Sequence, residues 1–128
     1  LAMPNALRAA RIALSDSTSL MVLYEILGNA KKFHPSHMPA VECAVTALAG
    51  NRVCVSLSDD GLHLSPQQLS RAFMPYQQIE KHSTGAIPGM GLGLSRVAIL
   101  VLQAGGQIHM RNREDKVGIT VEMELPIA

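Results

Sequence analysis

The chain has 128 residues, of which 48% are apolar, a size that suits a single domain and excludes two independent cores. Its formal net charge is only +1 and like charges form no block, which argues against nucleic acid as a partner. The longest apolar run, residues 97–102, is far shorter than the roughly 20 residues of a membrane-spanning helix, so we expect no membrane insertion of this domain.

The first half of the chain predicts a helix followed by a hairpin. Residues 3–10 suggest a short helix and residues 11–14 an edge strand. Asp16 or Ser17 can cap a longer helix, which should end at His34 because the residue before a proline avoids the helical region. The apolar positions of this helix recur at helical spacing: Leu20, Val22, Leu23, Ile26, Leu27, Ala30 and Phe33. Two alternating stretches, 41–47 and 53–57, flank a Gly50-Asn51 turn and predict a β-hairpin.

The second half contains a long polar segment between two regular regions. A short helix is expected at 66–73, inside a segment whose length is typical of a functional lid, from about Leu64 to Pro88. Residues 92–103 predict a well-buried helix, ended by glycines at 105–106. Alternating residues around 108–110 and 119–125 predict two strands, each with one solvent-facing side. These elements indicate an α+β sandwich in which helices cover one face of a mixed sheet.

Three short motifs suggest nucleotide chemistry. Glu25 and Asn29 are four residues apart on one helix face, where two oxygen-bearing groups can hold Mg²⁺, although such a pair is commonly just a solvated helix face. Asp59 follows an apolar strand and could accept a hydrogen bond from an adenine amino group, with Gly61 allowing close approach; Asp-Gly after a strand is also an ordinary turn. A Gly-x-Gly-x-Gly run at 89–93 leads into a helix, an arrangement that suits a phosphate.

The three motifs together, in this order, resemble a known family of domains, although each motif alone is too common to indicate it. From about Asp16 to Pro126 the sequence resembles the ATPase domain shared by histidine kinases, gyrase, the mismatch-repair ATPases and the ninety-kilodalton heat-shock chaperones. Lys32-Phe33 after the first motif, the segment at 73–76 and the compact glycine box at 89–94 are similar to histidine kinases in particular. The resemblance implies a two-layer sandwich of the Bergerat type, with residues 1–128 forming one ATP-binding catalytic domain.

The resemblance also implies roles for individual residues. Glu25 and Lys32 would be catalytic, and Mg²⁺ would be held by Asn29 and Glu25, directly or through water. Residues expected to contact ATP are Asn29, Lys32, Asp59, Gly61, Phe73, Tyr76, Gly89, Gly91, Leu92, Gly93, Leu94 and Thr120. Two positions depart from the family pattern: Glu25 stands where histidine kinases usually have Asn, and His63 stands where they have a second glycine, so a side chain there could crowd the nucleotide.

The function implied by the resemblance is transfer of the ATP γ-phosphate to a histidine on a separate dimerisation domain of the same protein. None of the five histidines lies in the surroundings of a phosphoacceptor, so the fragment alone should transfer nothing. The expected partners are that dimerisation domain and a response regulator, in a homodimeric full-length protein whose catalytic domain is cytoplasmic and whose membrane anchoring is left open. Two alternatives remain: a degenerate domain that serves as a docking or allosteric module, and a hydrolase with Glu25 as base.

Overall fold

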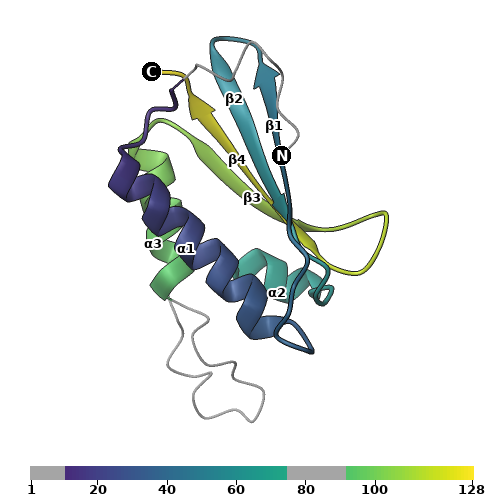
Figure 1. The fold of residues 1–128 in the computed structure, drawn as a ribbon. Helices are drawn as coiled ribbons and strands as arrows, with labels where there is room; N and C mark the ends of the chain where they lie inside the picture. The colour runs from purple at the N-terminus through teal and green to yellow at the C-terminus, as the bar shows by residue number, and fades with distance from the viewer. Residues whose placement is uncertain (1–10, 75–91) are drawn as a thin grey trace.

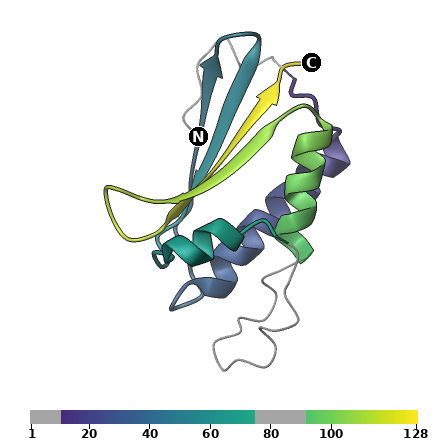
Figure 2. The same ribbon diagram turned by 180° about the vertical axis from the view of Figure 1, so that it is seen from behind.

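The computed structural model describes residues 11–74 and 92–128, which form two layers. The elements in chain order are α1 (Asp16–Phe33), β1 (Glu42–Leu48), β2 (Arg52–Ser58), α2 (Pro66–Arg71), α3 (Leu92–Gln103), β3 (Gln107–Asn112) and β4 (Ile119–Pro126). Figures 1 and 2 show the helices gathered on one face of a twisted sheet, and none of the described helices lies on the opposite face. The α+β sandwich predicted from the sequence is therefore confirmed; the helix expected at 3–10 lies outside the described residues.

The sheet has the strand order β1-β2-β4-β3, and each of its three pairings is antiparallel. The expectation of a mixed sheet is wrong for the described strands, because β4 returns between β2 and β3 and runs opposite to both. The predicted β1–β2 hairpin is confirmed; three residues connect the paired Leu48 and Arg52, and two of them, Gly50 and Asn51, have positive φ. The predicted edge strand at 11–14 is reduced to a single bridge between Ile12 and Ile127.

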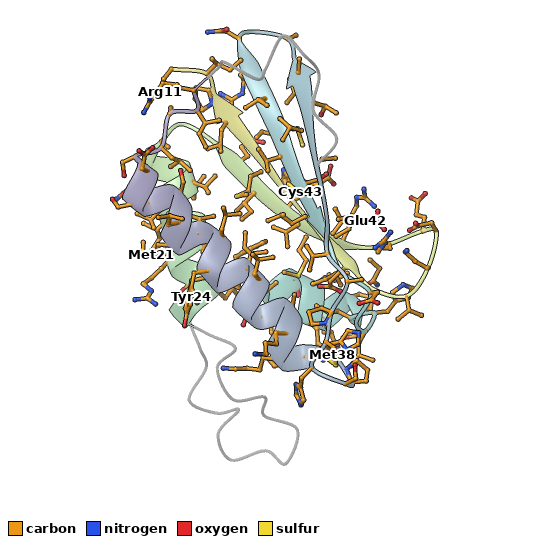
Figure 3. All side chains as sticks on the ribbon, in the orientation of Figure 1. Arg11, Met21, Tyr24, Met38, Glu42 and Cys43 are labelled. Atoms are coloured by element: carbon orange, nitrogen blue, oxygen red, sulfur yellow. The ribbon has the colours of Figure 1, made fainter. Side chains whose placement is uncertain are left out.

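Helix α1 begins one residue earlier than expected and buries a narrower face. Its N-cap is Ser15, whose hydroxyl accepts a hydrogen bond from the Thr18 amide at 3.2 Å, and it ends at Phe33 as predicted. Val22 and Ile26 are buried, whereas Leu20 is 68% exposed and Leu27 is 40% exposed. Figure 3 shows Met21 and Tyr24 pointing away from the sheet as well. The apolar residues of α1 thus cover a wider part of its surface than the face that packs against the core.

Helix α3 has the bounds that the sequence predicts, but only one side of it is buried. Leu94, Val97 and Val101 recur every three or four residues and are at most 3% exposed. Ile99 and Leu102 are more than half exposed, so the expectation of a well-buried helix holds for one face only.

One continuous aliphatic core joins the two layers. Its members from the sheet are Val53, Leu57, Val121, Met123 and Leu125, and those from the helices are Val22, Ile26, Leu94, Val97 and Val101. Complete burial of each such side chain contributes roughly 1.5–3 kcal/mol. Both cysteines are free thiols. No helix in residues 11–74 and 92–128 is long and apolar enough to cross a membrane.

Candidate nucleotide-binding site

A cavity of about 160 Å³ opens between α1, the ends of β2 and β4, and the segment that follows β2. Its walls are mainly aliphatic, contributed by residues such as Ile26, Leu57, Leu94 and Val121. Among the polar residues that line it are Asn29, from α1, and Asp59, from the end of β2. An apolar slot with a carboxylate at one side suits a flat heteroaromatic ring that carries an amino group.

Asp59 is buried, with 9% of its surface exposed, and hydrogen bonds hold its side chain in a fixed orientation. Its carboxylate oxygen Oδ1 accepts hydrogen bonds from the amides of Gly61, at 2.9 Å, and Ile119, at 3.4 Å. Within the described part of the chain, no hydrogen bond uses the second oxygen, Oδ2. A Cβ at Gly61 would lie 3.3 Å from Oδ1, so a side chain there would press on the carboxylate. One oxygen is thus anchored while the other remains available to a ligand.

Asp60, the next residue, faces a different set of groups and does not line the cavity. Its carboxylate accepts the Ala40 amide at 2.9 Å and lies 3.0 Å from the His34 ring. The Ala40 hydrogen bond, followed by the attraction of His34, holds the pKa of Asp60 below its ordinary value. Asp60 therefore ties the end of α1 to the turn that carries Asp59.

Thr120 does not line the cavity, whereas its neighbours Ile119 and Val121 do. Its hydroxyl forms a hydrogen bond of 2.8 Å with Ser58, its partner in the register of β2 and β4. Ser58 itself lines the cavity, so Thr120 stands one hydrogen bond behind the cavity wall. The expected contact between Thr120 and ATP stays a prediction, while Ile119, which the sequence reasoning missed, lines the cavity.

The α1 residues at the other end of the cavity are less closely fixed. Asn29 lines the cavity, while Glu25, one turn earlier, pairs with Arg96 of α3 at 3.1 Å. A Cβ on Gly93 would collide with the Glu25 carboxylate, so this glycine lets α1 and the first turn of α3 approach each other. Lys32 is exposed and does not line the cavity. Of the expected catalytic pair, neither residue reaches the cavity wall in this conformation.

The remaining predicted contacts divide into described and undescribed residues. Leu94 lines the cavity, and Phe73 packs against the core beside it without lining it. Tyr76, Gly89 and Gly91, together with most of the expected lid, lie outside the described residues. Leu92 begins α3, but its side chain is likewise outside them.

His63 lines the cavity, and its backbone does not need the conformational freedom of glycine, because its φ is not positive. Among the described residues, only His37 and Asn51 combine a side chain with a positive φ. The exposed imidazole of His63 instead lies with Nε2 3.1 Å from the carbonyl oxygen of Lys116.

The residues at this cavity fit an adenine nucleotide with bound Mg²⁺. The apolar walls and the free oxygen of Asp59 suit adenine, and Asn29 and Glu25 offer oxygen atoms on neighbouring turns of α1. The described residues contain no cluster of three or more His, Cys, Asp or Glu side chains able to hold a metal. A magnesium ion here would therefore depend on phosphate and water oxygens, as Mg²⁺ in phosphate sites usually does.

Comparison with known proteins identifies the family. The model of the histidine kinase-, DNA gyrase B- and HSP90-like ATPases matches residues 16–128. The chain belongs to this family. The autoinducer 2 sensor kinase/phosphatase LuxQ of Vibrio cholerae is 31% identical over 122 residues, which cover 92% of this chain and 14% of that protein. The non-motile and phage-resistance protein of Caulobacter vibrioides is also 31% identical, over 83% of this chain and 13% of its own length.

Solved structures support the same fold. The mycobacterial sensor histidine kinase MprB has a TM-score of 0.74 at 23% identity, covering 92% of this chain and 78% of that one. Full-length ShkA in complex with AMPPNP has a TM-score of 0.72 at 28% identity, covering 99% of this chain and 25% of that one. The resemblance to histidine kinase ATPase domains is thus confirmed, and nothing in the fold or in these relatives favours the degenerate module. The chain spans less than a fifth of the curated relatives named above.

Proposed function

We propose that residues 1–128 form the ATP-binding catalytic domain of a sensor histidine kinase, which delivers the γ-phosphate of ATP to a histidine on a dimerisation domain of the same protein. The observation that carries this proposal is the Asp59 carboxylate, anchored through one oxygen at the side of an apolar cavity. Such a carboxylate accepts from the amino group of adenine and rejects the carbonyl that guanine has at the same ring position.

The phosphates of the nucleotide would extend from the cavity toward α1 and the first turn of α3. Asn29 lines that path, and Glu25 and Lys32 lie on the same helix. Bound Mg²⁺ would supply charge neutralisation, with Asn29 and Glu25 holding it directly or through water. One oxygen of Glu25, Oε1, pairs with Arg96 of α3 at 3.1 Å. Because phosphoryl transfer depends mainly on positioning and charge, this set of residues suffices without a nucleophile of the domain's own.

The partners in this proposal are the dimerisation domain and a response regulator, within a homodimeric full-length protein. The solved structure of the histidine kinase ThkA in complex with the response regulator protein TrrA overlays this chain with a TM-score of 0.64 at 22% identity. That likeness shows the fold alone, so the partners rest on family membership. We place the domain in the cytoplasm, where ATP and response regulators are found.

Nucleotide titration tests the proposal directly. The protein is titrated in a calorimeter with ATP and with GTP, each with and without Mg²⁺. We expect saturable ATP binding that depends on Mg²⁺ and little binding of GTP. Absence of ATP binding at millimolar concentration would overturn the proposal, and equal binding of the two nucleotides would remove Asp59 from its assigned role.

A further inference from the structure

We infer that Arg113 is a positioning residue, which fixes Asp59 for recognition of the adenine amino group from the turn between β3 and β4. This inference rests on the proposed function, since it assumes that Asp59 is the adenine acceptor. The turn, residues 113–118, folds back against the end of β2 and the start of β1. Figure 1 shows it extending from the sheet beside these strand ends, and Figure 3 shows Glu42 of β1 next to it.

The side chain of Arg113 is only 5% exposed, and each of its three guanidinium nitrogens donates to an oxygen of a described residue. Its Nη1 donates to the backbone carbonyl of Asp59 at 3.0 Å. Its Nε and Nη2 donate to the two carboxylate oxygens of Asp115, at 3.0 and 2.9 Å, and Nη2 lies 3.4 Å from Glu42. A planar fork gripped on one side by a bidentate carboxylate presents its remaining nitrogen in a fixed direction. That direction leads to Asp59.

Asp59 is consequently held at its backbone and its side chain by one continuous segment, residues 113–119. Its amide donates to the carbonyl of Ile119 at 3.0 Å, and its Oδ1 accepts the Ile119 amide. Its carbonyl takes the Arg113 hydrogen bond and lies so close to Gly118 that a Cβ there would collide with it. A rotation of the peptide between Asp59 and Asp60 would therefore break the Arg113 contact and displace the Gly61 amide that anchors Oδ1 of the carboxylate.

The carboxylates around Arg113 do not by themselves require the arginine. The side chains of Asp115 and Glu42 are 66% and 64% exposed, so water can solvate both if the guanidinium is removed. The partner that is buried is the Asp59 carbonyl. Removal of the Arg113 side chain should therefore disturb the orientation of Asp59 more than it destabilises Asp115 and Glu42.

The test compares ATP with purine riboside triphosphate, which lacks the 6-amino group, for the unaltered protein and for Arg113→Met. We expect Arg113→Met to weaken ATP binding about tenfold, the low end of what a hydrogen bond to a charged group contributes, and to change binding of the analogue less than about twofold. Arg111→Met is the matched control, because Arg111 pairs with Glu122 and lies outside the cavity. It should leave both affinities unchanged.

The outcomes separate this inference from the proposed function. If the unaltered protein binds ATP and the analogue equally, Asp59 is not the adenine acceptor and this inference fails, whereas the proposed function fails only if ATP does not bind. If the unaltered protein prefers ATP, but Arg113→Met weakens both nucleotides equally or neither, the positioning role alone is wrong. Should Arg113→Met fail to fold, the same comparison is made with Arg113→Lys. Lysine keeps the charge, but its single ammonium group cannot bind both Asp115 oxygens and the Asp59 carbonyl together. Arg113→Lys should also weaken binding of ATP more than binding of the analogue.

Discussion

The two ends of the proposed nucleotide site differ in how firmly the protein holds them. At the adenine end, Asp59 is buried and the amides of Gly61 and Ile119 and the guanidinium of Arg113 surround it. At the phosphate end, Lys32 is exposed and Glu25 is paired with Arg96 across two helices. The adenine end is preformed, whereas fewer contacts among the described residues fix the side chains at the phosphate end. Base recognition should therefore respond to backbone changes, and phosphate binding should tolerate them.

Gly118→Ala is expected to have the largest effect at the adenine end. Gly118 has a φ of 136°, and a Cβ there would collide with the Asp59 carbonyl, a backbone atom that cannot move aside. We expect a loss of more than about 2 kcal/mol in the free energy of unfolding, measured with urea, together with weakened ATP binding. Gly28→Ala is the control, since a Cβ there meets nothing within 4 Å. Equal stability of the two variants would contradict the preformed adenine end.

Asp59→Asn should come next, acting on binding and not on the fold. Losing a hydrogen bond between the carboxylate and the adenine amino group should cost about 1.5–3 kcal/mol of ATP binding in calorimetry. The control is Asp60→Asn, because the Asp60 carboxylate faces Ala40 and His34 outside the cavity. An Asp60→Asn variant that loses as much affinity as Asp59→Asn would mean that the turn as a whole matters and not the Asp59 acceptor.

Gly93→Ala tests how firmly the protein holds the phosphate end of the site. A Cβ at this position meets the Glu25 carboxylate, the far end of a flexible side chain, which can swing away from Arg96. Because the ion pair is partly exposed, its loss should lower the free energy of unfolding by less than about 1 kcal/mol. In the background of Glu25→Ala the same substitution should cost nothing further, as a double-mutant cycle would show. A cost as large as that of Gly118→Ala would mean that the phosphate end is as rigid as the adenine end.

Local sequence signals were sufficient to locate most of the described elements. Proline after His34 fixed the end of α1, and Gly50-Asn51 fixed the hairpin turn, because both act through backbone geometry at the residue itself. The motif residues Asn29, Asp59 and Leu94 do meet at one cavity. Strand order was not predictable from the same signals, since an alternating strand does not indicate which strand will be its neighbour.

The differences between the expected and the observed lining of the site have equally specific causes. A family pattern placed Thr120 at the cavity, whereas Ile119, one residue earlier in β4, lines it and Thr120 lies behind Ser58. Arg113 was missed because it stands in a charged run, residues 113–116, that reads as an ordinary solvated turn. Only the fold shows that this arginine is buried beneath Asp59.

The smallest expected effect is a pH dependence that originates in the β3–β4 turn. Arg113 holds the pKa of Asp115 down to about 2 from an ordinary 3.8, chiefly through their hydrogen bonds, and Lys116 and Arg113 lower the pKa of Glu42. A carboxyl whose pKa is lower in the folded state stabilises that state above its unfolded pKa and loses this contribution as the pH falls through its folded pKa. The contribution of Asp115 is therefore present at pH 5 and declines between about pH 4 and about pH 2.

Urea unfolding of the protein and of Asp115→Asn, at steps from pH 5 to pH 2, measures this contribution. The difference in the free energy of unfolding between the two should be largest at pH 5 and shrink toward pH 2, where the carboxyl of Asp115 gains its proton in both states. The same carboxylate grips Arg113, so Asp115→Asn should also weaken ATP binding slightly at neutral pH while Glu114→Gln, a change at the neighbouring acid, does not. A difference that stays constant across the whole range would show that Asp115 acts through packing and not through its charge, and the ionic grip on Arg113 would then be wrong.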